Sequence, residues 1–129
     1  MVDENVFGND DDVIFLTVDQ VIDLHEEGIG RYSPTESLNI HDRGLLESAV
    51  MTPQQTFEGQ YLYQTLPEIA AAYMTGLTLN HAFENGNKRI GFAACFTFLR
   101  LNGYRLALSQ DEATQQVRSL ILGQYFPYL

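Results

Sequence analysis

The stretch from Asn87 to Leu101 limits the possible folds more than any other part of the chain. Its apolar residues would lie on nearly every side of a helix: Ile90, Phe92, Ala93, Ala94, Cys95, Phe96, Phe98 and Leu99. A helix that is apolar nearly all round has to be surrounded by other elements. The stretch therefore predicts a fold built around a buried central helix, which Asn102-Gly103 should end.

The part of the chain before this helix predicts one helix and a loop. Thr17-Val-Asp-Gln20 has the form of a capping box, in which each side chain accepts a hydrogen bond from the backbone of the other residue. Apolar residues follow at helical spacing until Gly28 and Gly30, which should interrupt the helix. Residues 30–40 are rich in Ser, Pro, Asn and Gly, and they predict a loop.

Two further helices and a hairpin are predicted between this loop and the central helix. Asp42 can cap a short helix. Residues 53–66 carry aromatic side chains around Glu58-Gly59, which favours a β-hairpin or an extended flap. Pro67 suits the first position of a helix that continues to Asn80. These elements predict an all-α class with one short hairpin.

The two ends of the chain predict different structures. Residues 1–12 are strongly acidic and offer little to bury, so we expect a mobile tail. Ser109-Gln-Asp-Glu112 has the form of a second capping box and predicts a final helix. The aromatic ending Tyr125–Leu129 predicts a segment that folds back or meets a partner. Residues 13–129 are expected to form a single domain.

The composition excludes several classes of function. Seven Lys and Arg against seventeen Asp and Glu give a formal net charge of −10, which disfavours extensive binding of nucleic acid or of an anionic membrane. No stretch approaches the roughly 20 apolar residues of a membrane span, and the acidic start is unlike a signal peptide. A cytoplasmic protein is therefore expected. The single cysteine, Cys95, should be a small core residue.

Two of the few cations lie side by side in the segment His81-Ala-Phe-Glu-Asn-Gly-Asn-Lys-Arg89. The segment leads into the central helix, where the backbone N–H groups of residues 86–88 should be unpaired and the helix dipole positive. Lys88 and Arg89 would add full charges to this anion site. His81 could remove a proton from a hydroxyl near neutral pH, which is the usual role of histidine as a general base. The combination favours transfer of a phosphorus-containing group.

Each of these features also has an ordinary structural explanation. A histidine at a helix end often makes a structural hydrogen bond, Asn-Gly is common in turns, and a Lys-Arg pair is commonly solvated. Phe83, which lies between them, should be a buried anchor of the loop. The sequence contains no HExxH, no cysteine cluster and no GxxxxGK[ST], so the usual zinc-hydrolase and P-loop patterns are absent.

The motif His81-x-Phe83-x-x-Gly86-Asn87-Lys88-Arg89 resembles the signature of the Fic/Doc family. It has the lysine-containing form of the Doc (death-on-curing) toxins of type II toxin-antitoxin systems. Other segments resemble the family in the same order, from about residue 14 to residue 123: Phe15–Val18, Leu24-His25, Gly44–Ala49, Pro53–Phe57 and Phe98–Tyr104. The resemblance implies a compact Fic/Doc-type helical bundle with a short β-hairpin flap.

The same resemblance implies a role for each residue of the motif. His81 would be the catalytic base, Lys88 and Arg89 would hold nucleotide phosphates, and Gly86 and Asn87 would form the anion-binding loop. ATP and Mg²⁺ are the implied cofactors. Lys88 replaces a glycine of the AMP-transferring Fic enzymes, which implies transfer of the γ-phosphate to a threonine of the translation elongation factor that delivers aminoacyl-tRNA.

Two alternatives and a set of partners accompany this expectation. The alternatives are AMP transfer to a protein hydroxyl and a non-catalytic module that binds nucleotide or a protein partner. The inhibitory helix motif of self-regulated Fic enzymes is absent, so regulation by a Phd-like antitoxin is implied. The hairpin segment corresponds to the flap that aligns the target. Its aromatic residues are therefore candidate docking residues or ordinary packing residues: Phe57, Tyr61 and Tyr63.

One position departs from the family pattern. Asn85 stands where members usually carry the Asp or Glu that coordinates Mg²⁺. An amide oxygen lacks the full negative charge of a carboxylate, so we expect a weakened or rearranged metal site. The neighbouring Glu84 could compensate only if the loop shifted, because adjacent side chains at a helix start point in different directions.

Overall fold

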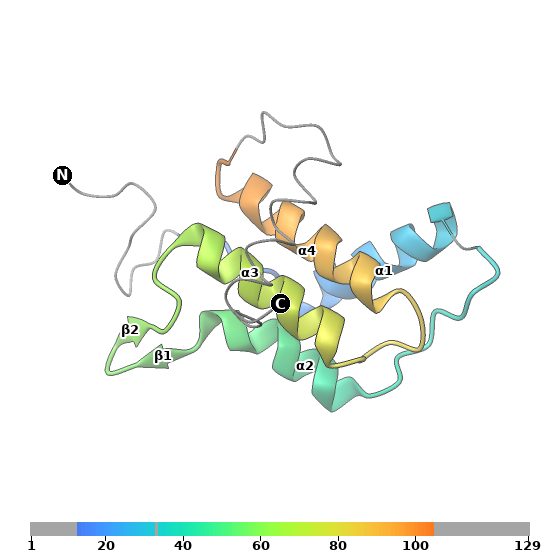
Figure 1. Cartoon of the computed structure of the whole chain (residues 1–129), viewed down its shortest axis with the longest axis horizontal. Coiled ribbons are helices and arrows are strands. Elements are labelled where there is room, and N and C mark those ends of the chain that lie inside the picture. Colours follow the sequence, from blue (N-terminus) through green and yellow to red (C-terminus); the bar gives the residue numbers. More distant parts are fainter. Residues whose placement is uncertain (1–12, 33, 105–129) are drawn as a thin grey trace, which may run out of the picture.

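The computed structural model describes residues 13–32 and 34–104, which form a small helical bundle with one hairpin (Figure 1). The α-helices in these residues are α1 (Val18–Tyr32), α2 (Arg43–Met51), α3 (Leu66–Leu79) and α4 (Asn87–Leu101). A 3₁₀ turn, Thr52–Gln54, follows α2, and the strands β1 (Thr56–Phe57) and β2 (Gln60–Tyr61) come next. The predicted all-α class with a short hairpin is confirmed.

Helix α4 has the predicted bounds and packs against both α3 and α1. Its buried residues are Ile90, Gly91, Ala94, Cys95, Phe98 and Leu99. Across the main interface the rings of Tyr73 and Phe98 lie 5.3 Å apart between centroids. Cys95 is fully buried, as predicted. The core therefore lies around α4, between α3 and α1.

A glycine lets α3 and α4 approach closely. A Cβ atom at Gly91 would lie 2.4 Å from Oγ1 of Thr78 and 2.9 Å from the carbonyl oxygen of Met74. Real Cβ atoms essentially never come so near to another heavy atom. The separation of the two helices therefore depends on the missing side chain of Gly91.

The predicted helix ends are present. In the capping box of α1, the N–H of Thr17 donates to Oε1 of Gln20 at 2.8 Å, and the N–H of Gln20 donates to Oγ1 of Thr17 at 3.1 Å. Asp42 caps α2 by accepting from the N–H of Leu45 at 3.0 Å. Helix α4 ends at Leu101 with Asn102 as its C-cap, and Gly103 adopts a φ of 87°.

Helix α1 is longer than predicted. The expectation that Gly28 and Gly30 interrupt it is wrong, because α1 continues to Tyr32 and the loop starts only afterwards. The reason is tertiary: Val21, His25 and Ile29 form one buried stripe at a spacing of four residues, and burial of this stripe holds the last turns against the core. Glycine disfavours a helix by only about 1 kcal/mol, which such packing can outweigh.

The hairpin is confirmed in the predicted segment. Thr56 pairs with Tyr61 and Phe57 with Gln60, so Glu58 and Gly59 form a two-residue loop. Both loop residues have positive φ, 52° and 82°, which is the conformation of a type I′ turn.

The start of α3 differs from its prediction by one position. The side chain of Thr65 caps the helix, since its Oγ1 accepts from the N–H of Glu68 at 3.2 Å. Leu66 is therefore the first helical residue and Pro67 the second.

The predictions for the acidic tail, for the capping box at Ser109 and for the aromatic ending concern residues outside the described ranges. Among the helices of residues 13–32 and 34–104, none is long and apolar enough to cross a bilayer.

Candidate functional site

The motif loop, residues 81–86, connects α3 to α4 and is held by the segment that precedes α2. The carbonyl oxygen of Ala82 accepts from the N–H groups of His41 and Asp42, at 2.7 and 3.1 Å. The N–H of Glu84 donates to the carbonyl oxygen of Asn39 at 3.1 Å. This strand-like pairing fixes the path of the loop, which Figure 1 shows at the end of the bundle where α4 begins.

The centre of the loop is anchored by Phe83. Its side chain is 2% exposed, and its ring stacks on the imidazole of His25, with centroids 3.7 Å apart and planes inclined by 12°. The backbone of Phe83 forms two hydrogen bonds with the side chain of Asn87: its N–H donates to Oδ1 at 3.0 Å, and its carbonyl oxygen accepts from Nδ2 at 2.8 Å. These bonds close the loop onto the first residue of α4.

These two bonds limit what Asn87 can offer to a ligand. Both polar atoms of its side chain are already engaged by Phe83. The contribution of Asn87 to an anion site would therefore come from its backbone N–H. The expected role of Asn87 in anion binding stays a prediction. Its side chain holds the loop in shape through its two hydrogen bonds to Phe83.

Gly86 stands at the point where the loop becomes a helix. Its φ of 77° favours glycine, and a Cβ atom there would lie 3.2 Å from Cδ1 of Ile29 and 3.5 Å from Nε2 of His25. As the N-cap residue it has no side chain to cap α4. The first hydrogen bond of the helix runs from the N–H of Ile90 to the carbonyl oxygen of Gly86, at 2.8 Å. The N–H groups of residues 87–89 therefore have no acceptor within the helix.

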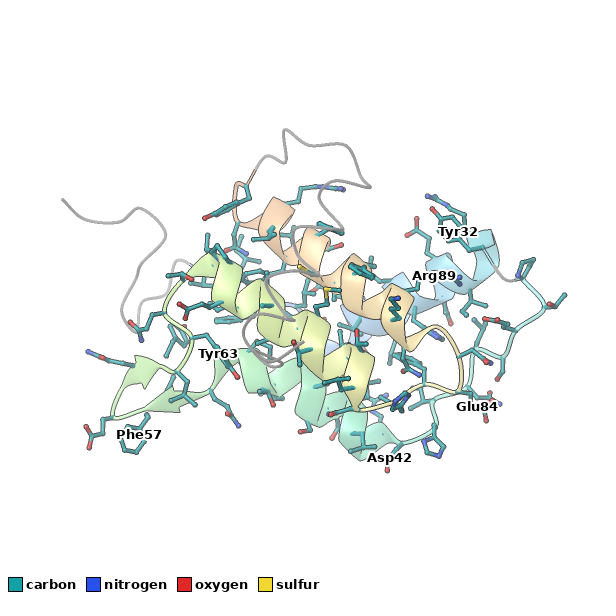
Figure 2. The ribbon with its side chains drawn as sticks, viewed as in Figure 1. Tyr32, Asp42, Phe57, Tyr63, Glu84 and Arg89 are labelled. Atoms are coloured by element: carbon teal, nitrogen blue, oxygen red, sulfur yellow. The ribbon has the colours of Figure 1, made fainter. Side chains whose placement is uncertain are left out.

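Lys88 and Arg89 are exposed on this first turn of α4. The guanidinium carbon of Arg89 lies 5.3 Å from the ring centroid of Tyr32, at the end of α1. Figure 2 shows these two side chains beside each other. The stem of Arg89 passes Gly28, where a Cβ atom would be 3.6 Å from Cδ of Arg89. Helix α1 therefore supports one of the two cations.

His81 lies at the other end of the loop and is exposed. Its φ of 52° is uncommon for a residue other than glycine, at a cost on the order of 1–3 kcal/mol. Nδ1 of His41 lies 3.3 Å from the carbonyl oxygen of His81, and since a carbonyl only accepts, the imidazole donates. The strained backbone of His81 is thus held by the segment before α2.

The residues expected near a metal ion have other contacts. When the amide of Asn85 is oriented to satisfy both of its polar atoms, its oxygen accepts from the N–H of Ser37 and its nitrogen donates to the carbonyl oxygen of Glu84, each at 3.3 Å. The side chain of Glu84 is exposed. Within residues 13–32 and 34–104 no three His, Cys, Asp or Glu side chains are grouped as metal ligands. Because Mg²⁺ in phosphoryl transfer needs only one or two protein ligands beside the phosphates, a Mg²⁺ site at Glu84 and Asn85 stays a prediction.

The candidate docking residues lie apart from the motif loop. Phe57 is 67% exposed on the hairpin, and Figure 2 shows it far from Glu84 and Arg89. The rings of Tyr61 and Phe15 lie 5.4 Å apart, and Tyr63 packs against the hydrophobic core. The structure therefore leaves Phe57 as the candidate with a freely accessible ring, and docking itself stays a prediction.

His25 and His41 contact the motif loop, although no role there was predicted for them. His25 lies four residues after Val21 and four before Ile29, and this spacing could have predicted that His25 is buried on one face of the helix. Burial lowers the pKa of His25, although its hydrogen bond to Asn85 and the charge of Glu26 act in the opposite direction. No comparable pattern pointed to His41.

Known sequences similar to this chain come from the Fic/DOC family. The sequence model of the Fic/DOC family matches residues 15–99. Toxin Doc of Mycolicibacterium smegmatis is 46% identical over 74 residues, which are 57% of this chain and 57% of that protein. Protein kinase doc of Escherichia phage P1 is 26% identical over 98 residues, 76% of this chain and 75% of that protein. The match to the first relative thus spans little more than half of its length. Because the family model matches well over half of the chain, including the motif loop, the chain belongs to the Fic/DOC family.

Proposed function

We propose that this protein is a Doc-like toxin that transfers the γ-phosphate of ATP to a threonine hydroxyl of a translation elongation factor and thereby arrests growth. The observation that carries the proposal is the first turn of α4, where uncapped N–H groups, Lys88 and Arg89 follow a loop that holds His81. The names of two relatives, Toxin Doc and Protein kinase doc, support the same class.

The start of α4 has the properties of a phosphate site. Backbone N–H groups without helical acceptors can donate to phosphate oxygens, and the helix dipole adds positive potential. Lys88 and Arg89 supply full charges, and the planar guanidinium can bind two oxygens of one phosphate. In a chain with a net charge of −10, this local group of cations favours a phosphate ligand over general binding of polyanions.

His81 would act as the general base of the transfer. Its imidazole would accept the proton of the target hydroxyl while the hydroxyl oxygen attacks the γ-phosphorus of ATP. A new O–P bond would form, the bond to the β–γ bridging oxygen would break, and ADP would leave. The exposure of His81 at the surface suits a protein substrate.

Mg²⁺ is proposed as the second cofactor, and it would neutralise phosphate charge when bound with ATP. Glu84 and Asn85 are the residues of the loop that could supply oxygen ligands. Asn85 brings an amide in place of a carboxylate, and Ser37 already engages that amide, so the proposed metal site is a weak one.

Two other functions have specific support. AMP transfer to a protein hydroxyl would use the same His81 and the same phosphate site, with Lys88 placing the nucleotide differently. A non-catalytic module that binds nucleotide or a protein partner is favoured by Asn85, because loss of the carboxylate would weaken catalysis before it weakened phosphate binding.

Partners follow from the proposed reaction. The elongation factor would be the substrate, with Phe57 on the hairpin as a candidate contact. A Phd-like antitoxin would neutralise the toxin by a segment that folds on binding. Both interactions would take place in the cytoplasm, and neither requires nucleic acid or a membrane.

The proposal is tested with the purified full chain, Mg²⁺ and a bacterial lysate, incubated in parallel with ATP labelled at the γ- or the α-phosphate. His81→Ala is the control for labelling by other enzymes. A band of elongation-factor size labelled only from the γ-phosphate is the expected result. Label from the α-phosphate alone would assign AMP transfer, and a protein that binds ATP without labelling any target would be a binding module.

A further inference from the structure

His25 is a polar residue buried where the core meets the motif loop. It is 2% exposed and lies on the buried stripe of α1, between Val21 and Ile29. The family motif lies some sixty residues further along the chain. The imidazole nevertheless contacts two of its residues, Phe83 and Asn85, and lies where a Cβ atom at Gly86 would be 3.5 Å from Nε2.

The contact with Asn85 is a short hydrogen bond to the backbone. Nε2 of His25 lies 2.7 Å from the carbonyl oxygen of Asn85, and because that oxygen can only accept, Nε2 carries the proton. The peptide bond between Asn85 and Gly86 is trans, so its N–H points opposite to its C=O. A carbonyl held against α1 therefore turns the N–H of Gly86 away from α1, outward from the core.

Packing fixes the position of the imidazole, and the space beside it suits glycine. The imidazole stacks on Phe83, and Nε2 would be 3.5 Å from a Cβ atom at Gly86. Since His25 is buried, water cannot easily replace its N–H as a donor to the Asn85 carbonyl. Among the contacts described, the orientation of the Asn85–Gly86 peptide thus depends on one side-chain donor, Nε2 of His25.

We propose that His25 is a positioning residue for nucleotide phosphate. By fixing the carbonyl of Asn85, it orients the N–H of Gly86 together with the following N–H groups of α4, so that they converge on one phosphate. This inference depends on the proposed function in one respect, since both take a nucleotide polyphosphate as the ligand. It assigns His25 no contact with the reacting atoms.

Two substitutions separate the hydrogen bond from the ring. His25→Phe keeps an aromatic ring against Phe83 and removes the donor, whereas His25→Gln removes the ring and keeps an N–H near the position of Nε2. Affinity for Mg·ATP and for ADP is measured by calorimetry on the full chain. We expect about tenfold weaker binding for His25→Phe, as for the loss of one buried hydrogen bond, and near-normal binding for His25→Gln.

A second histidine serves as a matched control. The ring of His41 contacts another carbonyl of the motif loop, that of His81, far along the loop from Gly86. His41→Ala should leave nucleotide affinity unchanged while lowering the transfer rate, because His41 supports the backbone of His81 and has no contact near Gly86 among those described. In transfer assays, His25→Phe should raise KM for ATP more than it lowers kcat, because it disturbs binding of the phosphate and leaves His81 in place.

A readout without ligand keeps the inference testable whatever the activity of the protein. The backbone order parameter of Gly86, measured by NMR in the nucleotide-free chain, should fall in His25→Phe from the rigid value of about 0.85 towards 0.6, and His25→Gln should restore it. Thermal melting confirms that both variants are folded.

The outcomes separate the two proposals. If the wild-type chain binds ATP without transferring phosphate, the proposed function fails and the role of His25 is still decided by the affinities. If the wild-type chain binds no nucleotide, the inference is wrong. It is then wrong even if Gly86 loosens in His25→Phe, because there is no phosphate to position. Equal losses in His25→Phe and His25→Gln, or none in either, would also show that donation by His25 does not position the loop.

Discussion

At the scale of single residues, the motif loop contains two positions with positive φ, and the two differ in the side chain that they carry. His81 and Gly86 both have positive φ, yet only one of them is a glycine. At Gly86 the conformation and the close approach of Ile29 both require the missing side chain. At His81 the proposed reaction needs the imidazole, so glycine cannot replace it. The backbone strain at His81 is offset by the hydrogen bonds that residues 39–42 form with the loop.

The amide of Asn85 leads to a prediction about Mg²⁺. Asn85→Asp should raise transfer activity several-fold at limiting Mg²⁺, because a carboxylate attracts the ion more strongly than an amide oxygen does. Its oxygen could still accept from the N–H of Ser37. The measurement is the rate of γ-phosphate transfer as a function of Mg²⁺ concentration. Asn85→Ala is the control, and an unchanged Mg²⁺ dependence in Asn85→Asp would refute the metal explanation.

Tyr73 predicts how stability depends on alkaline pH. Its hydroxyl accepts from the N–H of Leu16 at 2.9 Å, and burial raises the pKa of Tyr73 to about 12. The folded state therefore holds the phenol proton more tightly than the unfolded state, whose pKa is about 10. The resulting stability is present below about pH 10 and is lost as pH rises towards 12.

Tyr73→Phe tests this dependence by urea denaturation at several pH values. At pH 8 the variant should be less stable by about 1–3 kcal/mol, because the N–H of Leu16 loses its acceptor. Between pH 10 and 11.5 it should lose less stability than the wild-type chain. Parallel losses in the two proteins would mean that Tyr73 does not titrate as its burial implies.

At the scale of secondary structure elements, the interface between α3 and α4 depends on Gly91. A Cβ atom there would meet Thr78 and the backbone of Met74, which cannot move away without shifting α3. We expect Gly91→Ala to lower the free energy of unfolding by about 1–3 kcal/mol or more, as overpacking of a core does. Chemical denaturation followed by circular dichroism measures the change.

Gly30 provides the matched control for this substitution. It lies in α1, and a Cβ atom there would meet nothing within 4 Å. Gly30→Ala should stabilise the protein by about 0.4–1 kcal/mol, because alanine favours a helix and restricts the unfolded chain. If both substitutions changed stability in the same direction, steric contact at Gly91 would not be the cause.

At the scale of the whole molecule, local signals and long-range contacts explain what could be predicted. The capping box at Thr17, the cap at Asp42 and the bounds of α4 are encoded by neighbouring residues, and each was predicted correctly. The end of α1 was wrong because packing of the last turns on the core outweighs the two glycines. Propensity is a weak guide when tertiary contacts decide.

The site was predictable only in part, for the same reason. The motif lies in one stretch of sequence, so its residues could be named. The supporting contacts come from elsewhere: His25 lies 60 residues before Asn85 and His41 lies 40 residues before His81. The spacing of Val21, His25 and Ile29 indicates that His25 is buried, but spacing does not identify a contact so distant in the sequence.

Asn102 joins two distant parts of the molecule and gives a prediction at this scale. Its Oδ1 accepts from the N–H of Ile14 at 2.8 Å, and its Nδ2 donates to the carbonyl oxygens of Ile14 and Phe98, at 2.9 and 2.8 Å. One side chain thus ties the segment before α1 to the end of α4. Asn102→Ala should lower the free energy of unfolding by about 1–2 kcal/mol, since the bonds are partly exposed to water.

Asn102→Asp refines this prediction, because a carboxylate keeps the acceptor for Ile14 and loses both donated bonds. Its stability in urea denaturation should fall below that of the wild-type chain, because a carboxylate oxygen then faces the carbonyl oxygens of Ile14 and Phe98. The amide of Ile14 should exchange with solvent faster in Asn102→Ala than in Asn102→Asp, because only the aspartate retains an acceptor for it. Equal exchange in all three proteins would mean that the segment before α1 is held by its apolar contacts, with Leu16 fully buried beside Tyr73, and not by Asn102.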